Sequence, residues 1–154
     1  QHPHCRYQFF QAESIKRMRT GVVMSRRELR EQIFKLLFRV EFNSAEEMPE
    51  QERLFFDDEE AAKEKDAEYV SEKYQKIQEK LPQIDEMINE KAEKWDTARM
   101  SKVDLTILRL AVYEIMFDDS VPTGVAINEA VELAKKFGQD ASFSFVNGIL
   151  AKFA

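Results

Sequence analysis

The chain has 154 residues, of which 44% are apolar and 34% charged, and its formal net charge is −6. This length suits one domain with one core, while four glycines and four prolines are too few for a fold rich in tight β-turns. The only histidines and cysteine are His2, His4 and Cys5, which leaves residues 24–154 without groups for histidine or cysteine catalysis, a zinc finger, haem ligation or a disulfide framework. No glycine spacing fits a phosphate-binding loop, and no apolar run approaches the roughly 20 residues that span a bilayer. Composition therefore favours a binding protein over an enzyme and implies no cofactor or metal.

Residues 1–23 show no sustained helical or strand period, whereas a strongly amphipathic segment follows Met24 directly. We therefore divide the chain into a leader, residues 1–23, and a helical domain, residues 24–154. The leader is interpreted as an upstream or added segment outside the core, with a basic nucleic-acid-binding arm as the alternative. It lacks the apolar stretch of a secretory signal, and we expect a cytoplasmic protein.

Charge is distributed unevenly along the helical domain. Residues 24–45 carry five basic and three acidic side chains, whereas residues 46–94 carry eight basic and seventeen acidic ones. A basic start on an acidic body predicts a localised nucleic-acid contact rather than a general one.

The first predicted helix covers residues 26–42, with Ser25 as its N-cap and Glu28 completing a capping box. Beside its apolar stripe runs a flank on which arginines and phenylalanines alternate. Arginines contact phosphates and aromatic rings stack on bases, so this flank is a candidate RNA surface. The alternative is that the phenylalanines belong to the edge of the core and the arginines are solvated. The flank consists of Arg27, Arg30, Phe34 and Phe38.

The middle of the chain is predicted to be helical and highly charged. Residues 43–58 are expected to form a connection with one short helix, and a long helix follows to about residue 80. Pro82 is expected to begin the next helix, because proline suits a first turn. The many carboxylates show no metal-ligand spacing and are interpreted as a solvated face.

The segment 102–117 is apolar on almost every side, which predicts a buried central helix capped by Ser101. Arg109 in this helix must be paired or reach the surface, because an isolated buried charge is too costly. Two interpretations follow: a structural ion pair, or the floor of a binding surface. Two further helices are predicted, at 125–137 and from residue 143 onward, and Phe145 lies off the apolar stripe of the second. The fold class is all-α, one domain of six or seven helices.

Four stretches of the domain resemble the NusB family of bacterial transcription antitermination factors in order and spacing. The resemblance covers residues 24–154, is strongest in the last two stretches, and rests in the region 43–98 on helical pattern alone. The stretches are 25–31 (SRRELRE), 103–114 (VDLTILRLAVYE), 121–122 (VP) with 125–135 (VAINEAVELAK), and 145–150 (FVNGIL).

The resemblance implies an all-helical protein without a catalytic step. It would bind the boxA element of nascent ribosomal RNA together with ribosomal protein NusE, and support RNA polymerase with the other Nus factors. The RNA-binding residues that the resemblance implies are Arg26, Arg27, Arg30, Arg109 and Phe145. The NusE-contacting residues would be Phe38 and Asp104.

Two alternatives remain at this point: an RNA-targeting domain of the kind joined to RNA methyltransferases, and a helical protein–protein adaptor without an RNA role. The sequence leaves a homodimer open as well. If the flank binds RNA, Arg27→Ala or Arg30→Ala should weaken boxA binding without lowering the melting temperature.

Overall fold

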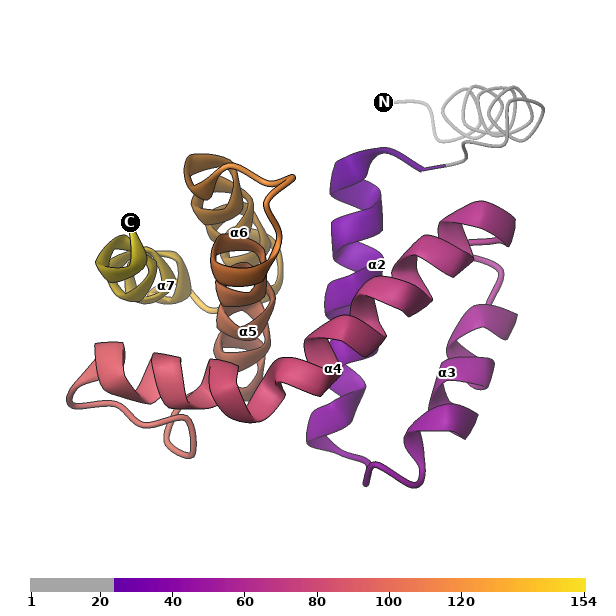
Figure 1. Cartoon of the computed structure of the whole chain (residues 1–154), viewed down its shortest axis with the longest axis horizontal. Coiled ribbons are helices and arrows are strands. Elements are labelled where there is room, and N and C mark those ends of the chain that lie inside the picture. The colour runs from indigo at the N-terminus through magenta and orange to yellow at the C-terminus, as the bar shows by residue number, and fades with distance from the viewer. Residues whose placement is uncertain (1–23) are drawn as a thin grey trace.

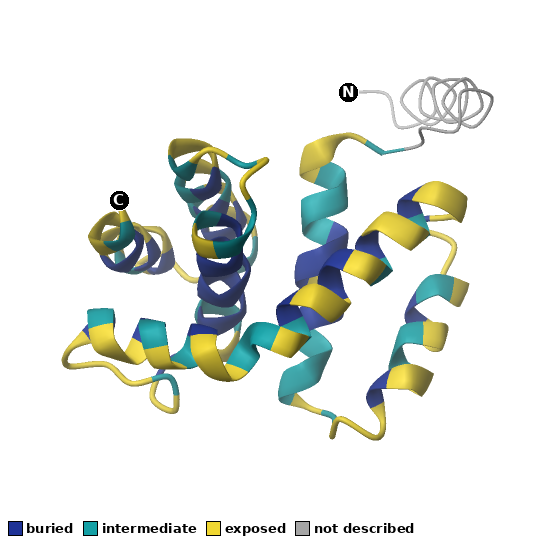
Figure 2. Cartoon of the chain, in the orientation of Figure 1, coloured by how far each residue is buried: buried dark blue, intermediate teal, exposed yellow. Residues whose placement is uncertain are grey.

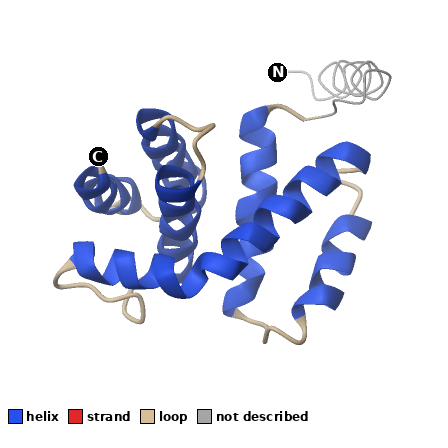
Figure 3. Cartoon of the chain, in the orientation of Figure 1, coloured by secondary structure: helices blue, strands red, loops and turns tan. Residues whose placement is uncertain are grey.

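The computed structural model describes residues 24–154, and within them it contains only helices and connecting loops (Figures 1 and 3). The expected leader, with His2, His4 and Cys5, lies outside the described residues. Across the described range no helix is long and apolar enough to cross a membrane. The all-α prediction is confirmed. The elements are α2 (Arg26–Phe38), a 3-10 turn η1 (Arg39–Glu41), α3 (Met48–Asp57), α4 (Glu64–Ala92), α5 (Lys102–Phe117), α6 (Thr123–Phe137), α7 (Ser142–Leu150) and a 3-10 turn η2 (Ala151–Phe153).

Helix starts follow the capping signals in the sequence. The Ser25 hydroxyl accepts a hydrogen bond from the Glu28 N–H, while the Glu28 carboxylate accepts one from the Ser25 N–H. Ser101 caps α5 in the same manner by accepting from the Asp104 N–H. Each cap satisfies N–H groups that the first helical turn cannot pair internally, so the entry points of α2 and α5 are fixed locally.

The expected helix boundary at Pro82 is wrong, because α4 continues from Glu64 to Ala92 with Pro82 inside it. An internal proline costs about 3 kcal/mol, since it removes one backbone hydrogen bond and crowds the preceding turn. Ile77, Ile84 and Ile88 are fully buried on either side of it. Burial of each such side chain contributes about 1.5–3 kcal/mol, so a continuous buried stripe outweighs the proline. The first helix also ends earlier than expected, at Phe38, and continues as η1.

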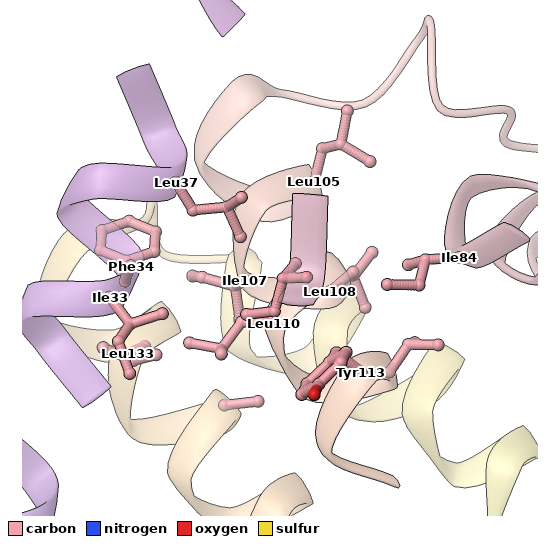
Figure 4. Packing of buried hydrophobic residues seen from close by; sticks show 14 of the residues in the cluster. Ile33, Phe34, Leu37, Ile84, Leu105, Ile107, Leu108, Leu110, Tyr113 and Leu133 are labelled. Carbon is pink, nitrogen blue, oxygen red and sulfur yellow. The ribbon is translucent and has the colours of Figure 1, made fainter. Parts of the chain in front are cut away.

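The core is centred on α5, whose residues 105–114 are all buried. Figure 2 shows α5 largely dark blue, whereas α3 and both ends of α4 carry much exposed surface. In Figure 4, Ile107 and Leu110 of α5 lie between Ile33 of α2 and Ile84 of α4. Helices α2, α4, α6 and α7 all pack against α5. This arrangement brings the start of α2 next to α6 and the end of α5, where the candidate site lies.

Candidate nucleic-acid interface

The first turn of α2 presents two exposed arginines. Arg26 has no ion-pair partner among the described residues, and its side chain faces solvent. Arg27 is 62% exposed and forms a two-pronged contact with Glu129 of α6, with Nη2 to Oε2 at 2.7 Å and Nε to Oε1 at 3.0 Å. The hydrogen bond from Arg27 holds the pKa of Glu129 below its ordinary value. Arg26, Arg27 and Arg30 line one groove of about 760 Å³ beside Tyr69 and Pro122.

Arg30, one turn further along α2, points inward instead. Its side chain is 11% exposed, and its guanidinium donates hydrogen bonds to the Glu114 carboxylate of α5. Arg30 Nη2 lies 3.0 Å from Glu114 Oε2, and Nε lies 3.1 Å from Oε1. Glu114 is 1% exposed and also receives Lys73 of α4, whose Nζ lies 2.7 Å from Oε2. Glu114 thus ties α2, α4 and α5 together, and we call the three side chains Arg30, Glu114 and Lys73 the Glu114 network.

These contacts change one expectation from the sequence. The sequence predicts that Arg30→Ala leaves the melting temperature unchanged, but Arg30 pairs with the buried carboxylate of Glu114. Arg30→Ala removes one of the two cations that pair with the buried Glu114 carboxylate and leaves Lys73 as its close partner, so the change should lower the free energy of unfolding. Arg30→Ala therefore tests folding as well as RNA binding.

Arg109 is buried in a second ionic cluster. Its Nε and Nη2 each lie 2.8 Å from an oxygen of Asp85 on α4, and its Nη1 lies 2.9 Å from Oε1 of Glu41 in η1. Burial alone would lower the pKa of Arg109, but the hydrogen bonds and charges of Asp85 and Glu41 outweigh it and raise that pKa. Of the two interpretations left open by the sequence, the structural ion pair is the one these contacts support.

Phe145 lies in a third place, on α7. Its ring contacts Trp95 edge to face, with centroids 6.0 Å apart, and Trp95 itself is half exposed. Phe145 is partly buried against the core. No ion pair or ring contact in the described chain joins Arg109 or Phe145 to the arginines of α2. The structure therefore groups Arg26, Arg27 and Arg30 and leaves the other two RNA candidates in separate settings.

One of the two candidate partner contacts, Phe38, lines a second groove, of about 410 Å³. Phe38 lines it with Phe34, Phe137 and Val103, and the rings of Phe34 and Phe38 stack with centroids 6.1 Å apart. Asp104 follows Val103 directly, and its Oδ1 is buried without a hydrogen-bond partner in the described part of the chain. Phe34 is buried, and its ring packs on the ring of Phe137 with centroids 5.0 Å apart, so Phe34 belongs to the edge of the core.

Sequence reasoning missed Glu114 and Glu129, the two carboxylates that hold the arginines of α2. A signal for Glu114 existed, because it lies beyond the first turn of the nearly all-apolar helix 102–117, where a charge needs a partner just as Arg109 does. Glu129 had no comparable signal, since it lies on a polar helix face. The described residues contain no cluster of three or more His, Cys, Asp or Glu side chains that would hold a metal ion.

The fold and these surfaces define a class: a small all-α protein with exposed arginines at the start of its first helix and an aromatic groove on that helix. The NusB family model matches residues 27–154. The chain belongs to the NusB family.

This chain is similar to its sequence relatives along nearly the whole length of each relative. The chain is 53% identical over 131 residues to the transcription antitermination protein NusB of Agathobacter rectalis, covering 85% of this chain and all of the relative. It is also 53% identical over 129 residues to the same protein of Lachnoclostridium phytofermentans, covering 84% and 98%.

Solved structures give the same fold. T. maritima NusB is 40% identical and superposes with a TM-score of 0.74, over 85% of this chain and 91% of the other. The NusB of a crystal structure of antitermination factors NusB and NusE in complex with dsRNA is 24% identical, with a TM-score of 0.72 over 83% and 94% of the two chains.

Proposed function

We propose that this protein is a transcription antitermination factor that binds boxA RNA of nascent ribosomal transcripts together with ribosomal protein NusE. In that complex it supports processive elongation by RNA polymerase with other Nus factors, in the cytoplasm and without a catalytic step of its own. The observation that carries the proposal is the 53% identity to antitermination proteins over their full length. The solved assembly of NusB, NusE and dsRNA shares this fold and supports the choice of partners.

The exposed end of α2 is the part we assign to the RNA backbone. Arg26 and Arg27 project into solvent and have guanidinium groups that suit phosphate oxygens. Arg109 and Phe145 remain candidate RNA contacts by resemblance, although Arg109 is committed to Asp85 and Glu41. Trp95 beside Phe145 adds an exposed aromatic face of the kind on which bases stack.

We assign the aromatic groove around Phe38 to NusE. Phenylalanine side chains line much of this groove, and its charged lining residues are Lys35, Arg39, Asp58 and Glu60. Asp104 follows the lining residue Val103 in sequence, and its buried Oδ1 has no hydrogen-bond donor among the described residues; such an acceptor is stabilised when a partner supplies one. We therefore expect NusE to donate a hydrogen bond to Asp104.

The mechanism is assembly. Phosphate contacts attract any RNA, whereas unstacked bases are distinguished by stacking and edge hydrogen bonds. Because the body of this chain is acidic, we expect weak RNA binding by the protein alone and tight, selective binding once NusE adds its own surface.

Filter binding tests the proposal with boxA RNA and a scrambled RNA of equal length, each with and without NusE. We expect boxA to be retained preferentially and NusE to increase that preference. The double variant Arg26→Ala/Arg27→Ala should bind more weakly, with a salt slope shallower by about 0.7 for each phosphate that the variant no longer neutralises.

Arg53→Ala is the matched control, because Arg53 is 59% exposed and pairs with Glu50 and Asp57 of its own helix α3. Equal retention of boxA and scrambled RNA at moderate salt would favour a protein–protein adaptor instead. Equal losses of affinity in the double variant and the control would remove α2 from the RNA interface.

A further inference from the structure

The face between α2 and α6 carries a repeated pattern, in which each of the cations Arg27, Lys135 and Lys136 lies beside a carboxylate. Arg27 pairs with Glu129, and Lys136 lies 2.8 Å from Oε1 of Glu31. Lys135 and Glu132 form a longer contact, with Nζ 3.8 Å from Oε2. These side chains and Arg30 line a groove of about 380 Å³. A surface that we assign to a polyanion is thus already neutralised from within the protein.

Glu129 differs from the other carboxylates in its geometry. It meets Arg27 with both oxygens, in the two-pronged arrangement that guanidinium also uses for phosphate. Its Oε1 lies 3.4 Å from Nη1 of Arg30 as well, and the carboxylate is only 15% exposed. Its position is therefore fixed by two arginines, and it occupies the side of Arg27 that a phosphate would take.

We propose that Glu129 acts as an internal phosphate substitute that holds Arg27 and weakens its binding to the phosphates of every RNA. This inference rests on the assignment of Arg27 to RNA. Any RNA that binds Arg27 must displace the Glu129 carboxylate, and the energy of that exchange is the same for every sequence. The free energy of this exchange is compensated only when the RNA makes additional base contacts or NusE binds beside it. Glu129 then acts through Arg27 to lower the affinity for every RNA, so that an RNA without further contacts binds too weakly to be retained.

The charged groups facing Glu129 are consistent with this role. Arg27 and Arg30 of α2 attract it, while Glu31 of α2 and Glu132 of α6 line the same groove. Arg30 remains held by Glu114 when Glu129 is changed. Removing the Glu129 carboxylate therefore frees Arg27 and leaves the buried network in place.

The test compares Glu129→Gln with Glu132→Gln, measuring Kd for boxA and scrambled RNA with NusE present. Both changes remove one negative charge from α6, but only the first releases Arg27. Glu129→Gln should tighten binding to both RNAs by about two- to fivefold, the range that an exposed ion pair is worth. The gain should be the same factor for boxA and scrambled RNA, because the exchange energy does not depend on sequence, and the salt slope should become steeper by up to about 0.7. Glu132→Gln should change Kd less than twofold.

A double-mutant comparison tests whether Glu129 affects RNA binding through Arg27. In an Arg27→Ala background, Glu129→Gln should give no gain, because the residue it releases is absent. Loss of folding would weaken RNA binding rather than tighten it. Glu129→Asp keeps the charge on a shorter side chain, and it should give a smaller gain in the same direction.

The outcomes separate the two claims. If Arg27→Ala weakens binding but Glu129→Gln matches Glu132→Gln, the inference is wrong and the RNA role of Arg27 stands. If Arg27→Ala has no effect in either background, the assignment of Arg27 to RNA is wrong, and the inference falls with it.

Discussion

Arg27 and Arg30 lie three residues apart on α2, yet they belong to two different regions. Arg30 is 11% exposed and belongs to the Glu114 network, whereas Arg27 is 62% exposed and pairs with Glu129. The same guanidinium group therefore contributes to folding in one place and is available for a ligand in the other. Residue type alone does not distinguish these roles. Burial and the number of committed partners do.

The largest expected effect comes from removing the shared anion of the Glu114 network. Glu114→Leu leaves Arg30 and Lys73 as buried cations without their main partner, which we expect to lower the free energy of unfolding by about 3–5 kcal/mol. Urea unfolding followed by circular dichroism measures this, with the exposed Glu132→Ala as control. A loss below about 1 kcal/mol would mean that the network contributes little to stability.

Arg109 should show a smaller effect of the same kind. Arg109→Leu leaves Asp85 and Glu41 unpaired, but both carboxylates are partly solvated, so we expect a loss of about 2–3 kcal/mol. Arg109→Lys should recover only part of it, because an ammonium cannot match the two-pronged contact with Asp85. Wild-type stability of the lysine variant in the same urea experiment would show that charge alone suffices.

Tyr74 is a buried residue with a polar hydroxyl group. Its hydroxyl has no hydrogen-bond partner in the described part of the chain, and burial raises the pKa of Tyr74 to about 12. Tyr74→Phe removes an unsatisfied group and keeps the ring, so unfolding should become harder by up to about 1 kcal/mol or stay the same. A clear loss of stability would reveal a partner for this hydroxyl.

The smallest expected effect concerns acid stability at the exposed end of α2. The hydrogen bond and charge of Arg27 lower the pKa of Glu129 below its ordinary value of 4.5. The pair therefore stabilises the fold above pH 4.5, and that contribution disappears as pH falls through the lowered pKa. The small difference in Tm between wild type and Arg27→Ala should narrow as pH falls below 4.5. A difference that widens on acidification would contradict the pairing.

Much of the fold could be predicted from the sequence, because caps and apolar periodicity are local. Ser25 and Ser101 mark helix starts that the structure confirms, and the central helix 102–117 is found as predicted. Pro82 misled the prediction, since the packing of Ile77 and Ile84 around it depends on tertiary contacts.

The site was harder to predict than the fold. The arginines of α2 stand out in the sequence, but their partners Glu114 and Glu129 are more than 80 residues away along the chain. Which arginine is buried depends on those distant partners. A charged pattern alone therefore predicts a surface and overestimates how many of its cations are free.

The most direct test of this account compares Arg27→Ala and Arg30→Ala in one urea unfolding experiment, with boxA affinity measured on the folded proteins. We predict that Arg30→Ala lowers the free energy of unfolding by about 2–3 kcal/mol, because Glu114 loses one of its two cationic partners and keeps Lys73. Arg27→Ala should leave stability close to wild type and weaken boxA binding in the presence of NusE. Equal stability losses in the two variants, or a stable Arg30→Ala protein, would contradict the division between a structural and a ligand-binding arginine.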